Sequence, residues 1–315
     1  MSQASGTTRV AVVAGPTGSG KSAFAERLVE CCDAEIVSAD ALQVYRGLDI
    51  GTAKPSRDDQ RRFRYHGVDL LGPGERCTAG SYADFTRPVI AAIAERGRLP
   101  LMVGGSGFYV DAALGRLDPL PASDPVWRAK LEDLAARNGA AAMHRWLRRL
   151  DPARANEVDA NDRQRVLRAL EIVMRAGRPI ADIAAMPTVD APTNEVLFLG
   201  LHWPRDQLYR RINARVDAML ADGWIDEVRG LLGAGVDPAS HSMKAIGYRH
   251  LCAVIGGEMT LDEARVAIAR DTRRYAKRQI TYFRRWPVRW IEMNEDTPSA
   301  SEEAATAAAA LLADE

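Results

Sequence analysis

The sequence predicts an α/β fold in which a parallel sheet flanked by helices is interrupted by a small all-helical inserted domain. Strand-like and helix-like segments alternate from Arg9 to Leu114, which is typical of a parallel sheet. The pattern turns helical after a Pro-rich breaker at 118–125, and a strand-like run returns at 195–201. These observations predict an α/β core with C-terminal helices, formed by residues 1–123 and 195–315, and a helical insertion at 124–194.

Each expected element has its own local signal. Short apolar runs predict strands, in chain order, at 10–14, 35–38, 99–103, 195–201 and 288–291. Helical periodicity predicts helices at 23–28, 81–96, 106–114, 126–138, 140–150, 162–176 and from 205 onward, with breaks at 233–235 and 256–257. We expect Pro88 to interrupt the helix at 81–96, because proline lacks the N–H that a helix interior requires. A second breaker is expected at 187–194.

The segment 15–22 is a complete phosphate-binding loop, Gly15-Pro16-Thr17-Gly18-Ser19-Gly20-Lys21-Ser22. It follows the apolar run 10–14 and precedes the helix-like run 23–28. The glycines let backbone N–H groups converge on phosphate oxygens, the helix start adds its positive dipole end, and Lys21 adds a charge. Ser22 is placed to hold Mg²⁺. The loop predicts a P-loop NTPase-like core that handles a polyphosphate, either a nucleoside triphosphate or another diphosphate ester.

An acidic partner for ATP hydrolysis is missing from the sequence. The run 99–103 leads into Gly104-Gly105-Ser106, and no apolar run ends in the Asp-Glu pair of a hydrolysing motor. The run 35–38 is followed by Asp40, which as an isolated residue suits a turn or a helix cap as well as chemistry. Because the carboxyl ends of parallel strands line the ligand crevice, we expect Asp40 near the phosphate loop.

Several segments, in order along roughly residues 9 to 290, together resemble one family. They are 15–22, 40–55, 103–106, 161–165, 246–249 and 277–281, and the stretch Asp49-Ile50-Gly51-Thr52-Ala53-Lys54-Pro55 is the most specific of them. They resemble the tRNA dimethylallyltransferases, which transfer a five-carbon prenyl group from dimethylallyl diphosphate to the exocyclic amine of an adenosine beside the anticodon. Ser22 and Ser106 stand where threonine is common, Gly18 where alanine is common, and Ala41 where serine is frequent, which removes one polar contact.

The resemblance implies a Mg²⁺-dependent enzyme that releases diphosphate and modifies N6 of the adenosine at position 37. The catalytic residues would be Lys21, Arg215 and Asp40, with Asp40 accepting the proton of the amine. The diphosphate would be bound by Gly15, Pro16, Thr17, Gly18, Ser19, Gly20, Lys21, Ser22 and Arg215. The tRNA would be bound by Asp40, Ala41, Leu42, Gln43, Ser106, Arg128, Asn161, Asp162, Arg163, Gln164, Arg165, Lys244, Gly247, Tyr248, Arg249, Arg273, Lys277, Arg278 and Gln279. From spacing alone, Arg211 and Arg215 form an exposed stripe four residues apart on a helix.

Charge distribution supports a nucleic-acid partner although the formal net charge is zero. The run 273–285 contains no acid and interleaves arginine with aromatic residues, and basic residues also outnumber acidic ones at 145–178. An isolated basic run is usually a solvated helix face. Two such runs beside a phosphate loop favour a basic cleft that holds a single-stranded RNA loop.

Composition agrees with a monomeric cytoplasmic enzyme without defining its activity. The four cysteines lack metal-ligand spacing, so no zinc site is expected. The polar residues 1–8 contain no apolar signal core, and no segment is apolar enough to span a membrane. The alternatives are a small-molecule P-loop kinase, an isopentenyltransferase acting on free nucleotides, and an RNA-binding P-loop motor, which would need the missing acid pair.

Overall fold

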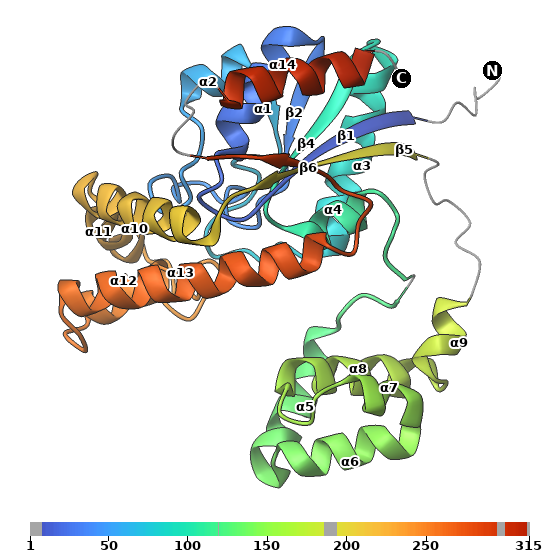
Figure 1. Ribbon diagram of the computed structural model, residues 1–315. Helices are drawn as coiled ribbons and strands as arrows, with labels where there is room; N and C mark the ends of the chain where they lie inside the picture. The colour runs from blue at the N-terminus through green and yellow to red at the C-terminus, as the bar shows by residue number, and fades with distance from the viewer. Residues whose placement is uncertain (1–7, 119, 186–193, 295–299, 314–315) are drawn as a thin grey trace. The chain divides into compact units, whose positions relative to one another are not determined.

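The computed structural model describes residues 8–118, 120–185, 194–294 and 300–313 (Figure 1). The chain separates into two compact units, with boundaries after Gly115 and after Ala191. The segments on either side, up to Gly115 and from Pro192, form an α/β unit, and Arg116–Ala191 forms a helical unit. The expectations for residues 1–7 and for the breaker at 187–193 lie outside the described residues.

The α/β unit contains a fully parallel sheet, as the sequence predicted, with six strands among the described residues where five were expected. The strands are β1 (Thr8–Ala14), β2 (Ala34–Ser38), β3 (Tyr65–His66), β4 (Leu99–Gly104), β5 (Asn194–His202) and β6 (Arg289–Glu292), in the spatial order β3-β2-β4-β1-β5-β6. Strand β3 was not predicted, because two residues are too short to show a period. Since β1 lies between β4 and β5, the loop that follows it opens at the centre of the sheet edge.

Helices cover both faces of this sheet (Figure 1). The helices described in this unit are α1 (Lys21–Cys31), α2 (Arg57–Arg62), α3 (Ala79–Glu95), α4 (Gly107–Ala113), α10 (Arg205–Ala221), α11 (Trp224–Gly233), α12 (Tyr248–Ile255), α13 (Leu261–Phe283) and α14 (Ala300–Ala313). Alternate residues of β1 enter two separate cores. Val10 and Val12 pack in the core that includes Tyr82 of α3, whereas Ala11 and Val13 pack in the core of α1 and α14. A strand segment buried on both faces needs an apolar residue at every position, and residues 10–14 of β1 are all apolar.

The expected interruption at Pro88 was wrong, because α3 runs unbroken from Ala79 to Glu95. Proline removes only one helical hydrogen bond, and two features compensate for it. Thr78 and Ser81 form a capping box that fixes the start of the helix. Ile90 and Ile93, which follow the proline, are buried against the sheet and hold the last turns in place.

The helical unit is all-helical, as predicted, and has its own core. Its helices are α5 (Pro125–Asn138), α6 (Ala140–Leu150), α7 (Pro152–Glu157), α8 (Arg163–Ala176) and α9 (Ile180–Ala184). Leu131, Leu147 and Leu170 are completely or almost completely buried in this core. The short helices α7 and α9 were missed, because five or six residues do not establish a helical period. None of the helices in the described residues is long and apolar enough to cross a membrane.

A buried carboxylate near the start of β2 is held by four basic side chains. Glu35 accepts hydrogen bonds from Arg96 at 2.7 Å, Arg64 at 3.2 Å and Arg98 at 3.3 Å, and its Oε2 lies 2.8 Å from Nε2 of His66. Burial by itself would raise the pKa of Glu35, but the hydrogen bonds from Arg96, His66 and Arg64 outweigh it and lower the pKa to about 2. The carboxylate therefore stabilises the fold only while it is ionised.

We expect this stabilisation to disappear in acid. An unfolded glutamate titrates near pH 4.3, so the contribution of Glu35, roughly 2–4 kcal/mol, should be complete above about pH 5 and lost as the pH falls toward 2. Urea unfolding of the wild type and of Glu35→Gln measures it directly, because the difference between their unfolding free energies should narrow between pH 5 and pH 3. The same difference at pH 3 and at pH 7 would show that Glu35 does not titrate in this window.

Candidate active site

A cavity of about 530 Å³ opens at the carboxyl ends of β1, β2 and β4. It is lined by the phosphate loop, by residues 40–43 and 51–53, by the end of β4, and by side chains of α10, α13 and the segment before α12. Its volume lies in the range of small-ligand sites. Lys21, Asp40 and Arg215 all line it, so the structure brings together the three residues that the sequence marked as catalytic.

The phosphate loop has the backbone geometry that its glycines allow. Gly18 and Gly20 have φ angles of +82° and +86°, in the left-handed region that favours glycine. The loop leads directly into α1, whose first residue is Lys21, and the ammonium group of Lys21 donates to the carbonyl of Pro16 at 2.9 Å. Behind the loop, the indole of Trp203 donates to the carbonyl of Ser19 at 3.0 Å. The amide groups at the start of α1 therefore face the cavity on a fixed backbone.

Two cations and one carboxylate set the electrostatics of the cavity. Burial, and next the positive charge of Arg215, lower the pKa of Lys21 to about 7, whereas the negative charge of Asp40 acts in the opposite direction. Burial also lowers the pKa of Arg215, and Asp40 again opposes the shift. Two positive groups held together away from water favour an anionic ligand between them, and a diphosphate has the matching charge.

A further cation braces the phosphate loop. Arg211 donates through Nε to the carbonyl of Gly18 at 2.9 Å, and its guanidinium lies 4.1 Å from the ring centre of Trp203. Arg211 and Arg215 therefore face the loop and the cavity, and the exposed stripe that spacing alone suggests was wrong. The role of Arg211 was missed because a spacing of four residues shows that two side chains share a helix face but not what that face contacts.

Asp40 has the local contacts of a turn residue and also reaches the cavity. Its Oδ1 accepts hydrogen bonds from the backbone N–H of Leu42 at 2.8 Å and of Gln43 at 3.4 Å. The next residue, Ala41, donates its N–H to the hydroxyl of Ser106 at 3.1 Å. Ser106 thus holds the segment that carries Asp40. The turn and the chemistry are compatible, because a carboxylate that accepts local bonds at one oxygen retains further acceptor capacity.

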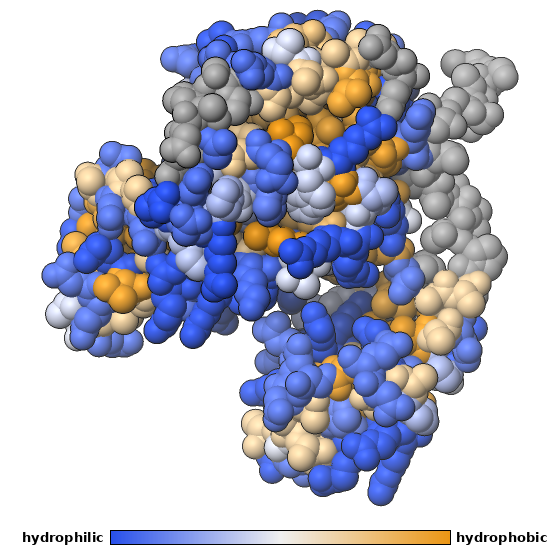
Figure 2. All heavy atoms as spheres, viewed as in Figure 1, coloured by the Kyte–Doolittle hydropathy of each residue, from blue (hydrophilic) through white to orange (hydrophobic). Residues whose placement is uncertain are grey.

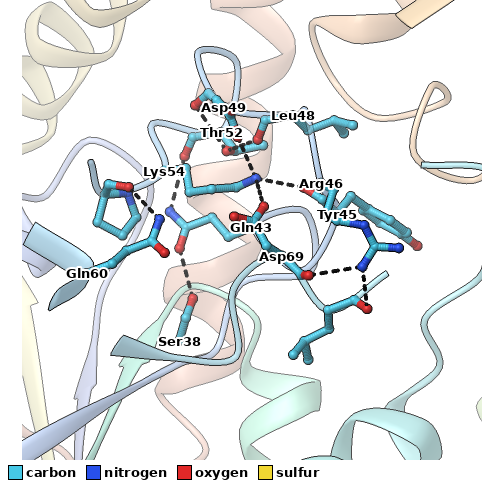
Figure 3. Close-up of polar contacts among 12 residues, drawn as sticks. Ser38, Gln43, Tyr45, Arg46, Leu48, Asp49, Thr52, Lys54, Gln60 and Asp69 are labelled. Atoms are coloured by element: carbon cyan, nitrogen blue, oxygen red, sulfur yellow. Dashed lines mark hydrogen bonds and ion pairs between the residues drawn. The ribbon is translucent and has the colours of Figure 1, made fainter. Parts of the chain in front are cut away.

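Gln43 and residues 51–53 of the stretch 49–55 line the cavity, and Figure 3 shows the polar contacts that hold them. The side chain of Gln43 is buried, accepts a hydrogen bond from the hydroxyl of Ser38 at 2.8 Å, and donates to the carbonyls of Thr52 and Ala53 at 3.3 Å each. Gln43 therefore connects the end of β2 to this stretch and fixes the wall beside Asp40.

Lys54, near the end of the same stretch, holds it through three polar contacts (Figure 3). Its ammonium group is 3% exposed and contacts the carbonyl of Tyr45 at 2.7 Å and the carboxylates of Asp49 and Asp69 at 2.6 Å each. A buried lysine is tolerated only where its donors are all engaged, as they are here. Lys54 therefore ties this stretch to Tyr45 and Asp69.

Helices α11 and α12 support this wall from behind. The carboxylate of Glu227 accepts from the backbone N–H groups of Asp49, Ile50 and Gly51 at 2.8, 2.6 and 3.3 Å. It also accepts from the hydroxyl of Tyr248 at 2.7 Å. Tyr248 is completely buried, so its side chain holds Glu227 inside the protein. Because the Tyr248 side chain is buried, RNA could contact this residue only through its backbone.

The indole ring of Trp224 leaves no space for a side chain at Gly51 or Gly247, two glycines in the segments that resemble the family. Trp224 lines the cavity, and a Cβ atom at either Gly51 or Gly247 would overlap its indole ring. Gly247 also has a φ angle of +92°, where other residues are strained. Lys244 and Arg249, on either side of Gly247, are exposed and line the cavity. Gly247 therefore permits the backbone conformation that places Lys244 and Arg249 at the cavity.

Helix α13 presents an aromatic and basic border. Tyr275 and Arg278 line the cavity, and the guanidinium of Arg278 lies 5.7 Å from the ring centre of Tyr275. Burial raises the pKa of Tyr275 to about 12, and the negative charge of Asp40 adds to the effect. Lys277 is exposed, whereas Arg273 donates to Asn213 at 2.6 Å. In Figure 2 the surface over α13 is mostly hydrophilic. Gln279, in contrast, is 5% exposed and contacts the phosphate loop.

In the helical unit, the residues assigned to RNA binding gather around Glu132 of α5. Arg128 forms an ion pair with Glu132 at 3.2 Å, and Arg163 donates to the backbone carbonyl of the same residue at 3.3 Å. Asp162 caps α8 by accepting from the N–H of Arg165. Asn161, Gln164 and Arg165 are exposed. The start of α8 and the middle of α5 therefore form one polar surface within this unit.

No group of three or more His, Cys, Asp or Glu side chains that could hold a metal ion occurs among the residues that the structure describes. The hydroxyl of Ser22 and the carboxylate of Asp40 both line the cavity, and hard oxygen donors of this kind fit Mg²⁺.

Comparison with known proteins places this geometry in a family. The family model of IPP transferases matches residues 43–286, and that of isopentenyl transferases matches residues 8–65. The chain belongs to the IPP transferase family. The resemblance identified from the sequence is thereby confirmed.

Relatives of this IPP transferase match it over nearly their whole length. The tRNA dimethylallyltransferase of Geobacter sulfurreducens is 44% identical over 300 residues, covering 95% of this chain and 96% of the relative. That of Syntrophobacter fumaroxidans is 44% identical over 284 residues, covering 90% and 83%. The crystal structure of the tRNA isopentenylpyrophosphate transferase of Bacillus halodurans is 33% identical, with a TM-score of 0.67, and covers 98% of this chain and 100% of its own.

A second solved structure supports the fold alone. A eukaryotic dimethylallyltransferase acting on tRNA is 22% identical to this chain, with a TM-score of 0.81, and the match covers 98% of this chain and 80% of the other. The expected P-loop NTPase-like α/β fold is confirmed by the parallel sheet and by these neighbours.

The sequence of this IPP transferase placed Tyr275 within the basic and aromatic run 273–285 but did not single it out as a site residue. Tyr275 lies three residues before Arg278 and four before Gln279, so the three share one side of α13. Helical spacing around the two assigned positions could have identified it. The specific roles assigned to the other site residues remain predictions.

Proposed function

We propose that this enzyme transfers a dimethylallyl group from dimethylallyl diphosphate to N6 of adenosine 37 in tRNA, releasing diphosphate. The observation that carries the proposal is that one cavity contains a phosphate loop with two buried cations, an aspartate, and a basic and aromatic border on α13. This combination suits a diphosphate donor and a nucleobase acceptor in contact with each other. It contains no acid pair of the kind that activates water for ATP hydrolysis.

The chemistry requires most assistance at the leaving group. The N6 amine is a poor nucleophile, because its lone pair is delocalised into the purine ring. An allylic C–O bond breaks readily once the developing negative charge on the diphosphate is stabilised. The backbone amides at the start of α1, Lys21 and Arg215 supply that stabilisation. Mg²⁺, when bound through Ser22 and the diphosphate oxygens, would supply further charge neutralisation.

The acceptor side uses Asp40. As the new C–N bond forms between N6 and the prenyl carbon, the amine nitrogen becomes positively charged and must lose a proton. The Asp40 carboxylate at the cavity wall takes this proton. The base has to leave its stack to reach the cavity, which costs little in a single-stranded loop. Tyr275 can stack on the base, and Arg278, Lys244 and Arg249 can hold the nearby phosphates.

A direct test is diphosphate release from dimethylallyl diphosphate with and without tRNA. Release that depends on added tRNA supports the proposal. Release with free nucleotides but not with tRNA would instead support an isopentenyltransferase that acts on nucleotides.

Charge reversal on α13 should weaken tRNA binding selectively. Lys277 and Arg278 are exposed, so replacing both by glutamate should raise the apparent KM for tRNA and leave donor affinity nearly unchanged. Affinity for tRNA should also become less sensitive to salt. In a plot of log affinity against log salt concentration, the slope should become shallower by roughly one to two, because two phosphate contacts are lost.

A matched control reverses Arg61 and Arg62 of α2, which are exposed and pair with Asp58 and Glu30. This variant carries the same change in charge, so it separates a local contact from a general electrostatic effect. If the α13 variant bound tRNA normally at every salt concentration, the basic run would be only a solvated helix face.

A further inference from the structure

Gln279 is the side chain that joins the phosphate loop to α13. Its Oε1 accepts a hydrogen bond from the N–H of Thr17 at 2.8 Å, and its Nε2 donates to the carbonyl of Gly105 at 2.9 Å. Both partners are backbone groups, so the orientation of the amide is defined. We propose that Gln279 is a positioning residue of the transfer reaction, which acts through the backbone to hold the phosphate loop for the donor. This inference rests on the proposed function.

The hydrogen bonds continue from Gly105 toward Asp40. Ser106, the next residue, donates its N–H to the carbonyl of Ala39 at 3.1 Å and accepts at its hydroxyl from the N–H of Ala41 at 3.1 Å. The Gln279 amide therefore joins the loops that follow β1 and β4, and Ser106 joins the second of these to the loop that follows β2. These loops carry the groups that bind the diphosphate and the carboxylate that takes the proton. A shift of Gln279 would change the distance between the two halves of the site.

The two closest replacements in size cannot make both bonds. A glutamate carboxylate lacks the donor for Gly105, and a methionine has no donor and only a weakly accepting sulfur. Gly105 has no room for a side chain, because a Cβ atom there would overlap the amide nitrogen of Gln279. The glycine and the glutamine thus fit each other, which explains the close approach of α13 to the end of β4.

Helix α13 is itself fixed in place near this contact. Asp111 of α4 accepts from the hydroxyl of Tyr282 at 2.6 Å and from the indole of Trp286 at 2.9 Å. Lys277 and Arg278, directly before Gln279, are exposed. One anchored helix therefore carries the cations proposed to bind RNA on its outside and the amide that holds the phosphate loop on its inside. Gln279 therefore lies on the same helix as the proposed RNA contacts but faces the phosphate loop.

The experiment separates this role from a direct contact with tRNA. Gln279→Met should raise the KM for dimethylallyl diphosphate and slow single-turnover transfer by roughly 10-fold to 10²-fold, as small displacements of bound reactants do. Its affinity for tRNA should stay within about twofold of the wild type. Gly105→Ala, which pushes on the same amide from the opposite side, should give the same result. Arg278→Met should give the reverse, a weaker tRNA affinity with an unchanged donor KM.

Loss of tRNA affinity with normal donor kinetics in Gln279→Met would overturn the inference, and so would wild-type kinetics in both variants. Hydrogen exchange on the wild-type protein provides a test that needs no stable variant. The Thr17 amide should exchange as slowly as the amides of α1, and fast exchange would show that the bond to Gln279 is not maintained. Failure of the wild type to transfer the prenyl group would contradict the proposed function instead.

Discussion

Replacing Asp40 by asparagine is expected to slow single-turnover prenyl transfer by roughly 10²–10⁴-fold while both substrates still bind. An asparagine side chain has the same shape and keeps an oxygen that can accept from the N–H groups of Leu42 and Gln43. It cannot take the proton of the amine. The turn should therefore survive and the proton transfer should not.

Three measurements on the Asp40→Asn variant distinguish the possible roles. Transfer should fall, whereas tRNA affinity and melting temperature should stay close to those of the wild type. Near-normal transfer would remove Asp40 from the mechanism and leave it as a turn residue. A variant that fails only because it no longer binds tRNA would identify Asp40 as a contact to the base.

Lys21→Ala is expected to lower the rate of transfer by roughly 10²–10³-fold, the usual effect of removing one group that stabilises developing charge. Lys21 lies at the start of α1 and lines the cavity, so the loss should appear at the donor and not at the tRNA. Pre-steady-state transfer at saturating tRNA measures it, with tRNA affinity as the control. A loss smaller than about tenfold would mean that the loop amides and Arg215 stabilise the diphosphate without Lys21.

The parts of the site that the sequence could predict are those coded by adjacent residues. The phosphate loop is recognisable because its glycines, Lys21 and Ser22 act within one turn of backbone. Asp40 could be placed near it because parallel strands end at the same edge of the sheet. The main strands of the sheet could be predicted in the same way, because each is an apolar run of strand length.

The parts that could not be predicted depend on contacts between distant residues. Thr17 and Gln279 are 262 positions apart, and nothing local in either segment indicates that they touch. Resemblance assigned Tyr248 and Gln279 to RNA binding, but packing buries both side chains. Pro88 shows the converse, since a local rule for breaking helices was overridden by the burial of neighbouring residues against the sheet.

Nucleoside analysis of the reaction product tests the proposed activity most directly. The purified protein is incubated with dimethylallyl diphosphate, Mg²⁺ and an unmodified tRNA transcript, and the digested tRNA is examined by mass spectrometry. The expected result is one N6-dimethylallyl adenosine at position 37 for each diphosphate released, with no product when position 37 is guanosine or when free AMP replaces tRNA. Hydrolysis of ATP stimulated by tRNA, with no prenylated adenosine formed, would contradict the proposed activity.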